Sequence, residues 1–279
     1  MSAGLPILTS RLVHIYRSEG SDVAALSGVD LRVRAGEQIG LLGPSGAGKS
    51  TLLSLLGGLF RPSAGTIQVG DVELSAATTR ELEDLRAGTI ALVLQGAWRN
   101  LLPYLTPREN VGFAQYAARR LGREVPEVDD VLSTVGLAGA GEAALTALTP
   151  GQLQLCAVAV AVAAAPGVLL ADEPTSQLDH VARDRVMAAL AEVNRSLGAT
   201  VVVVTHDPDV AASLPRTVTI RDGRVGGEGR SGEEYSVVTA DGFLPLPTHA
   251  REALVPGTLV RVEQSGDRFV LDPAPEEER

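Results

Sequence analysis

The sequence predicts an α/β protein built around a mostly parallel sheet. Short runs rich in Val, Leu and Ile alternate with helical patterns, and near-continuous apolar runs are typical of strands that are covered on both faces. Hydrophobic residues make up 45% of the chain and aromatic residues only 3%, so the core must consist largely of Ala, Val and Leu. The predicted buried strands are 39–43, 89–95, 167–174 and 200–208.

The clearest helix is predicted at His180–Leu197, between the last two of these strands. Its apolar residues recur at helical spacing, and Gly198 follows as a stop signal. A hairpin is predicted at 217–225, around the dipeptide Asp222-Gly223. The apolar stripe of the helix consists of Val186, Leu190, Val193 and Leu197.

We expect the chain to contain two domains joined by a linker. Residues 1–225 form the α/β domain, with an inserted helical arm at about 98–165, where strand signals are scarce. The Gly-rich stretch 226–232 is expected to be the linker. Residues 233–275 are expected to form a small β-rich module with a Leu-Pro-Leu-Pro strand, a short helix and a closing hairpin.

The charge balance disfavours a nucleic-acid partner. Lys and Arg total 24 against 34 Asp and Glu, a net charge of −10, and residues 232–279 hold 10 acidic residues and 4 Arg. Neutralising nucleic-acid phosphates requires the opposite sign. A single Cys excludes an intramolecular disulfide. The apolar run Leu155–Ala171 is interrupted by Pro166-Gly167, so we expect a buried helix, a turn and a strand rather than a membrane span.

A Gly-rich loop follows the first predicted buried strand. The segment GPSGAGKST (43–51) fits the pattern G-x-x-x-x-G-K-[ST], and an apolar helix is expected to follow it. Backbone N–H groups of such a loop converge on phosphate oxygens, and the helix N-terminus adds partial positive charge. Lys49 is the only lysine in the chain, as expected where the chemistry needs a compact ammonium. The segment therefore predicts a phosphate site, with the Ser50 hydroxyl as a Mg²⁺ ligand.

Two carboxylates follow the predicted strand at 168–171. Asp172 and Glu173 stand at the carboxyl end of a parallel strand, where α/β proteins bind their ligands. Asp172 is a candidate Mg²⁺ ligand, and Glu173 is a candidate to orient and deprotonate an attacking water. Together with the Gly-rich loop, this pair predicts a nucleoside triphosphatase with a P-loop NTPase (RecA-like) core.

Residues 7–225 resemble the ATP-binding subunit of an ATP-binding-cassette (ABC) transporter. The Gly-rich loop is similar to the family's Walker A segment, and the strand before Asp172-Glu173 is similar to its Walker B segment. Further similarities follow the family's order. Gln95 resembles the Q-loop glutamine, and residues 176–179 resemble the D-loop. His206 resembles the switch histidine, and Tyr16 resembles the aromatic residue that stacks on adenine.

The resemblance implies that two such subunits sandwich two ATP molecules with Mg²⁺ and power a separate transmembrane permease at the cytoplasmic face of the cell membrane. It implies catalytic roles for Glu173, His206, Gln95 and Lys49. The implied Mg²⁺ ligands are Ser50, Gln95 and Asp172. The implied nucleotide-binding residues are Tyr16, Gly43, Ser45, Gly46, Gly48, Lys49, Ser50, Thr51, Thr149 and Gly151.

Within the family, the stretch 99–110 resembles the lipoprotein-release and macrolide-export type of ATPase. In that type of ATPase, a groove near this stretch grips the permease. The resemblance implies that Leu101, Leu102 and Tyr104 contact the permease here. The alternative is that these three side chains belong to the local helical core.

The signature segment departs from the family pattern. The family's LSGGQ corresponds here to LTPGQ (148–152), where Thr149 keeps a hydroxyl, Gly151 keeps the second glycine and Pro150 replaces the first. Proline is tolerated in the first turn of a helix but removes one backbone N–H donor. Because in the family this segment caps the γ-phosphate held by the other subunit, the resemblance favours a second, non-identical ATPase subunit here.

The C-terminal residues 234–273 resemble the swapped-hairpin AbrB-type fold. Their acidic balance favours a dimerising or regulatory module over DNA binding, and a plain stabilising appendage is the alternative. For the whole chain, two further readings stay open. One is a soluble ABC ATPase that acts on DNA or ribosomes, and the other is a weakly hydrolysing nucleotide-binding partner subunit.

Overall fold

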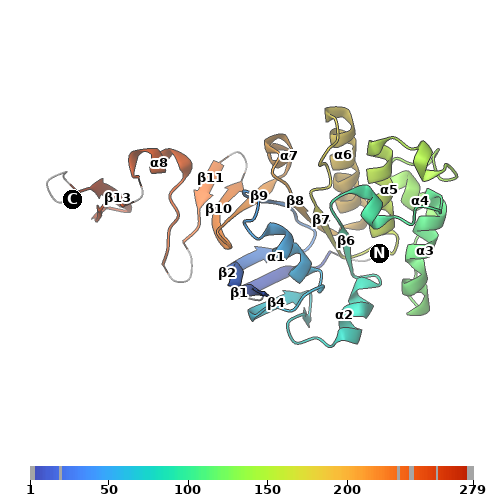
Figure 1. The fold of residues 1–279 in the computed structure, drawn as a ribbon, viewed down its shortest axis with the longest axis horizontal. Helices are drawn as coiled ribbons and strands as arrows, with labels where there is room; N and C mark the ends of the chain where they lie inside the picture. Colours follow the sequence, from blue (N-terminus) through green and yellow to red (C-terminus); the bar gives the residue numbers. More distant parts are fainter. Residues whose placement is uncertain (1–3, 19–20, 231–232, 239–241, 256, 275–279) are drawn as a thin grey trace. The chain divides into compact units, whose positions relative to one another are not determined.

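The computed structural model describes residues 4–18, 21–230, 233–238, 242–255 and 257–274. The chain divides into two compact units, Met1–Tyr235 and Ser236–Arg279. The first unit contains two sheets and most of the helices (Figure 1). The predicted α/β class is confirmed.

The larger sheet has seven strands in the order β11-β10-β9-β3-β8-β7-β6. Strands β3, β6, β7, β8 and β9 pair in parallel, and β10 pairs with β9 in the antiparallel sense. The four predicted buried strands are β3, β6, β7 and β8. The bounds are β3 Gln38–Leu42, β6 Ile90–Val93, β7 Val168–Asp172, β8 Thr200–Val204, β9 Arg216–Arg221, β10 Arg224–Arg230 and β11 Glu233–Ser236.

The smaller sheet is antiparallel and has the order β2-β1-β4-β5. Its strands are β1 Ile7–Ser18, β2 Ser21–Val33, β4 Ala64–Val69 and β5 Val72–Glu73. Helix α1, Lys49–Leu56, contacts β2 and β4 of this sheet as well as β7 and β8 of the larger one. Its leucines at 52, 53, 55 and 56 are all buried, because the helix lies between two apolar surfaces.

The helical arm lies beside β6 (Figure 1). It contains η1 Ala97–Asn100, α3 Pro107–Arg120, α4 Val128–Thr134, η2 Leu145–Ala147 and α5 Pro150–Val162. Helix α5 is apolar on almost every side because it packs against α3, α4 and α6 at once. Besides α1, the helices described outside the arm in the first unit are α2 Thr79–Arg86, α6 His180–Leu197 and α7 Pro208–Ser213.

The structure corrects the predicted linker at 226–232 over residues 226–230, and residues 231–232 lie outside the described part of the chain. Residues Arg224–Arg230 form β10, which pairs with β9 as far as Arg230 opposite Arg216. The sheet therefore continues where a linker was expected. The glycines of this stretch suit a strand whose backbone approaches its neighbour closely, since a Cβ at Gly229 would stand 2.4 Å from the Thr217 hydroxyl oxygen.

The second unit contains helix α8, Thr248–Ala253, and an antiparallel hairpin of β12, Val260–Ser265, and β13, Arg268–Pro273. The expected short helix and closing hairpin are therefore present. The Leu-Pro-Leu-Pro segment at 244–247 is not a strand, because each proline lacks the N–H that a ladder requires. No helix in the described part of the chain is long and apolar enough to cross a membrane.

An ion-pair group joins β3, β9 and β10. The Arg216 side chain is 13% exposed and pairs with Glu37 at 3.2 Å and with Glu228 at 2.8 Å. Burial acts to raise the pKa of Glu228, but hydrogen bonds from Arg216 and Arg230 outweigh it and lower the pKa below the ordinary 4.5. The Glu228 contribution to stability is therefore complete above pH 4.5 and is lost as the pH falls through the lowered pKa.

We expect Arg216→Met to reduce the free energy of unfolding by about 1–3 kcal/mol, because it leaves the largely buried carboxylate of Glu37 without its cation and leaves Glu228 with only the more exposed Arg230. Urea unfolding at pH 7 would measure the change. Arg195→Met is the matched control, since Arg195 pairs with Glu192 on the surface with 75% of its side chain exposed. Equal stability of the two variants would contradict the role assigned to Arg216.

Candidate active site

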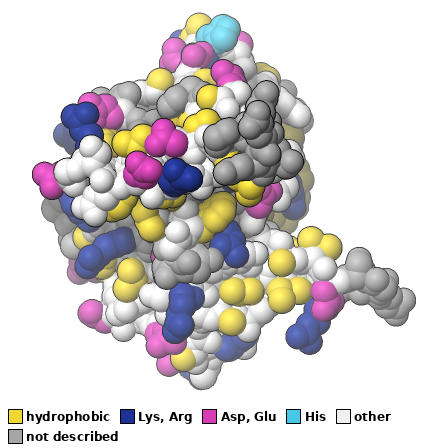
Figure 2. All heavy atoms as spheres, turned by 90° about the vertical axis from the view of Figure 1, so that its left-hand side faces the viewer, with side chains coloured by type: hydrophobic (Ala, Val, Ile, Leu, Met, Phe, Trp, Pro, Cys, Tyr) yellow, Lys and Arg dark blue, Asp and Glu magenta, His cyan; other side chains and the backbone are white. Residues whose placement is uncertain are grey.

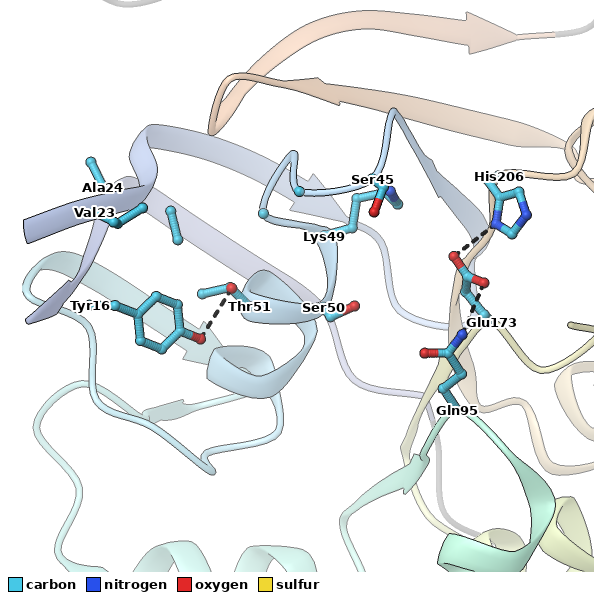
Figure 3. A pocket seen from close by; sticks show the side chains of 13 residues that line it. Tyr16, Val23, Ala24, Ser45, Lys49, Ser50, Thr51, Gln95, Glu173 and His206 are labelled. Atoms are coloured by element: carbon cyan, nitrogen blue, oxygen red, sulfur yellow. Dashed lines mark hydrogen bonds and ion pairs between the residues drawn. The ribbon is translucent and has the colours of Figure 1, made fainter. Parts of the chain in front are cut away.

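A cavity of about 620 Å³ lies where α1, the ends of β6, β7 and β8, and strands β1 and β2 meet (Figure 3). It brings together most of the site residues expected from the sequence. The lining residues are Tyr16, Val23, Ala24, Ala25, Ser45, Gly46, Gly48, Lys49, Ser50, Thr51, Gln95, Glu173 and His206.

Two glycines of the loop leave no room for a side chain. Gly43 has φ 143°, and a Cβ there would stand 2.1 Å from the Ile220 carbonyl oxygen. Gly48 has φ 96°, and a Cβ there would stand 2.3 Å from the Ala25 carbonyl oxygen. The loop therefore needs glycine at both positions for its backbone course, before any ligand is considered.

The Lys49 ammonium is held beneath the loop. Its Nζ donates to the carbonyl oxygens of Gly43 and Pro44, both at 2.8 Å, and the residue is only 6% exposed. Gly48 is the N-cap of α1 and offers no side-chain acceptor, so the first N–H groups of the helix remain available to an anion. This end of the cavity has the donors that phosphate oxygens require.

A hydroxyl and a carboxylate oxygen meet beside this loop. Ser50 Oγ on α1 donates to Asp172 Oδ1 at the end of β7, at 3.1 Å. Burial raises the pKa of Asp172, and the hydrogen bond from Ser50 offsets part of that effect. Mg²⁺ prefers such oxygen ligands, so the pair fits the metal that the sequence implies.

The Glu173 carboxylate is held by two side chains from neighbouring strand ends. Its Oε1 lies 2.8 Å from His206 Nδ1, and its Oε2 accepts from Gln95 Nε2 at 3.3 Å (Figure 3). The Glu173 backbone has φ 46°, an unusual conformation for a residue other than glycine. This strain turns the side chain out of the β7 direction and into the cavity, as is common at functional sites.

The opposite end of the cavity is apolar. The Tyr16 ring is 42% exposed there, and its hydroxyl lies 3.2 Å from Thr51 Oγ1 (Figure 3). Val23, Ala24 and Ala25 on β2 complete this end, and sequence reasoning missed them. Only the pairing of β1 with β2, which places Val23 opposite Tyr16, could have indicated them.

Two of the expected nucleotide-binding residues lie elsewhere. Thr149 and Gly151 stand at the start of α5 and are not among the residues that line the cavity. Thr149 is exposed, and its side chain caps the helix by accepting from the Gln152 N–H. In this chain alone, the signature segment does not contribute to the cavity.

The expected permease-contact residues fall in three different environments. Leu101 is 7% exposed and belongs to the core cluster of the arm, so its prediction as a surface contact is corrected. Leu102 is half-buried, and Tyr104 is 78% exposed. The local-core alternative thus holds for Leu101 alone, because its side chain fills space between the arm and the sheet.

Known proteins share these features. The family described as ABC transporter matches residues 26–176. The chain belongs to the ABC transporter family. A lipoprotein-releasing system ATP-binding protein, LolD, of Anaeromyxobacter dehalogenans is 44% identical over 208 residues, covering 73% of this chain and 85% of the relative. A methionine import ATP-binding protein, MetN, of Streptomyces coelicolor is 40% identical, covering 81% of this chain and 66% of the relative.

Other relatives extend this comparison. The macrolide export ATP-binding/permease protein MacB of Rhodopirellula baltica is 38% identical over 75% of this chain, which spans only 31% of that longer relative. Among solved structures, the dimeric cassette MJ0796 in a post-hydrolysis state with ADP and Pi has a TM-score of 0.69 and 31% identity, covering 80% of this chain and 98% of the other. The chain is therefore an ABC ATPase, the ATP-binding and hydrolysing subunit of a transporter.

We expect Glu173→Gln to leave ATP binding intact and to lower ATP turnover by roughly 10²–10⁴-fold. The amide keeps the hydrogen bonds to Gln95 and His206 but does not accept a proton from water at neutral pH. Phosphate release and titration calorimetry would measure the two effects, with Glu192→Gln on the surface of α6 as the control. Unchanged phosphate release from the Glu173 variant would disprove the assignment.

Proposed function

We propose that this ABC ATPase hydrolyses ATP with Glu173 as the residue that orients and deprotonates the attacking water. The observation that carries the proposal is the position of the Glu173 carboxylate, which is held on one oxygen by His206 and on the other by Gln95. Such a carboxylate is fixed in direction before any substrate binds, which favours proton transfer from a water at one defined place.

Other residues in and next to the cavity are proposed to bind the nucleotide and the metal. The Gly43–Thr51 loop and Lys49 bind the phosphates, and Tyr16 stacks on the base. Ser50, Asp172 and Gln95 hold the Mg²⁺, which supplies charge neutralisation at the phosphates when it is bound. His206 supports the charge that develops on the γ-phosphate. All lining residues lie in the first unit, so the second unit is proposed to be an accessory module.

We propose further that the site is completed by a second ATPase subunit, since Thr149 and Gly151 lie outside the cavity of their own chain. The start of α5 offers few free donors. The Thr149 N–H donates to Gln152 Oε1 at 3.0 Å, and the Gln152 N–H donates back to Thr149 Oγ1 at 3.3 Å. Pro150 has no N–H, so the Gly151 N–H is the remaining donor of this turn.

A second copy of this chain would therefore present a weak cap to the γ-phosphate. Gly151 is packed closely against α6, since a Cβ there would stand 2.8 Å from that of Ala182. A partner with an intact signature would restore the missing donor, which favours a non-identical second subunit. Leu153 and Leu155, where the family usually has polar residues, are 8% and 6% exposed and belong to the core, so they have no part in the cap.

The permease is proposed to bind the outer surface of the arm. Tyr104 is 78% exposed, and Phe113 and Tyr116 on α3 are 63% and 61% exposed. Exposed aromatic side chains in one region are typical of protein interfaces. The loop that carries Tyr104 is fastened to α3 by the buried Asn110, which accepts from the Leu102 N–H at 2.8 Å and donates to the Thr106 carbonyl at 3.0 Å.

Binding to a permease through this surface would place the ATPase at the cytoplasmic face of the membrane, where ATP is present. The net charge of the chain disfavours a nucleic-acid partner. On the face drawn in Figure 2, described basic and acidic side chains are interspersed, and the chain as a whole has a net charge of −10. A nucleic-acid surface would instead show basic side chains gathered on one face.

We expect the double change Tyr104→Asp with Phe113→Asp to abolish permease-stimulated phosphate release while ATP binding stays within about two-fold, because the altered side chains lie outside the cavity. Co-purification with the permease and calorimetry would test this. Val72→Asp, on an exposed strand of the smaller sheet, is the control. Retained co-purification and stimulation in the double variant would exclude this surface as the contact.

We expect Pro150→Ala to raise ATP turnover of the pure chain by up to about 10²-fold, since it restores a backbone N–H aimed at the partner's γ-phosphate. Pro107→Ala is the matched control, because Pro107 holds the same first-turn position in α3. Phosphate release by the pure chain measures both variants. Rapid turnover at two equal sites by the unmodified chain would show that LTPGQ is a competent signature.

A further inference from the structure

Three aromatic rings meet behind the base end of the cavity. The His14 ring meets the Tyr16 ring edge-on, with centroids 4.8 Å apart and planes at 85°. Phe60 stacks on His14 with centroids 6.1 Å apart and meets Tyr16 edge-on at 6.4 Å. Among the described residues, Tyr16 lines the cavity whereas His14 and Phe60 do not. The two outer rings therefore support Tyr16 from the side away from the nucleotide.

The backbone fixes this arrangement. His14 and Tyr16 are two residues apart on β1 and so lie on the same face of the strand. Phe60 follows α1 in a turn that is fastened to β1, since the Ile15 N–H donates to Ser63 Oγ at 3.0 Å and the Ser63 N–H donates to the Val13 carbonyl at 2.8 Å. The rings are thus held by rigid elements on both sides.

The contacts of His14 are made by its ring face and edge rather than by hydrogen bonds from its nitrogens. The residue is 9% exposed, and its Nδ1 is buried without a hydrogen-bond partner among the described residues. A buried polar atom without a partner is unfavourable, so nothing in its hydrogen bonding explains this side chain. The contact that remains is aromatic, between the His14 ring and its two neighbours.

We propose that His14 and Phe60 are positioning residues that fix the plane of the Tyr16 ring for stacking on the nucleotide base. The Tyr16 hydroxyl is held at one end by Thr51 Oγ1, and the body of the ring is held by His14 and Phe60. A ring fixed in advance loses less conformational entropy when the base binds. This inference rests on the proposed stacking role of Tyr16.

The experiment compares two ligands on the full chain. MgATP carries a base, whereas Mg-tripolyphosphate reaches only the phosphate loop. We expect His14→Ala to weaken MgATP binding by about three- to ten-fold, the range that aromatic pair energies imply, and to leave Mg-tripolyphosphate binding within about two-fold. His14→Phe should bind MgATP as the unmodified chain does, because it keeps the ring and loses no hydrogen bond at Nδ1.

Two further variants keep the test decisive. Phe60→Ala removes the second ring. Because Phe60 is 47% exposed, this variant can replace His14→Ala in the test if His14→Ala does not fold. We expect it to reduce the affinity for MgATP less than His14→Ala does and to leave the affinity for Mg-tripolyphosphate unchanged. Equal weakening of both ligands, or no weakening of either, would overturn the proposal. Tyr16→Ala separates this inference from the proposed stacking. If Tyr16→Ala leaves MgATP affinity unchanged, the proposed stacking is wrong. If Tyr16→Ala lowers MgATP affinity but the His14 and Phe60 variants do not, only the present inference is wrong.

Discussion

The site of this ABC ATPase is arranged around one carboxylate, that of Glu173, which is held between side chains from the two neighbouring strand ends. Strands β6, β7 and β8 lie next to one another in parallel, so residues at or just beyond their carboxyl ends reach the same place. The Glu173 N–H also donates to the Val204 carbonyl at 3.0 Å, which extends the ladder to the residue whose backbone is strained. The backbone pairing of the sheet and the two side-chain contacts therefore both hold the Glu173 side chain in place.

The phosphate end of the cavity depends on a similar constraint in the backbone. Gly43 and Gly48 approach carbonyl groups of other segments too closely for any Cβ, and Lys49 is anchored to the loop itself. The loop is therefore formed by the protein before a nucleotide binds. The base end is formed in the same way, by rings and strand backbone rather than by the ligand. Binding of a ligand to such a preformed site requires little reorganisation of the protein.

We propose different partners for the two ends of the arm. Its outer surface carries exposed aromatic side chains and is the proposed permease contact, whereas the start of α5 is proposed to face a second ATPase subunit. The core of the arm connects them, because α5 contacts both α3 and α6. Leu101, Leu153 and Leu155 fill this core, which explains why Leu101 is not part of a contact surface and why apolar residues follow the signature segment.

The sequence by itself determined the α/β class, the phosphate loop and the identity of the cavity residues other than Val23, Ala24 and Ala25. The order of the buried strands and the spacing of the loop are local patterns, and local patterns are visible in one dimension. It also placed the bounds of α6 correctly, because the apolar stripe and Gly198 are both local signals.

Only the tertiary structure decided which neighbour each residue meets. It showed Leu101 as core and Tyr104 as surface, which hydrophobicity does not separate. It replaced the expected linker by β10, since strand pairing is a property of two segments and not of one. It placed His14 and Phe60 behind Tyr16, 46 residues of chain apart, because the turn after α1 returns to β1. Pairing and burial depend on contacts between distant segments, and the sequence of one segment does not contain them.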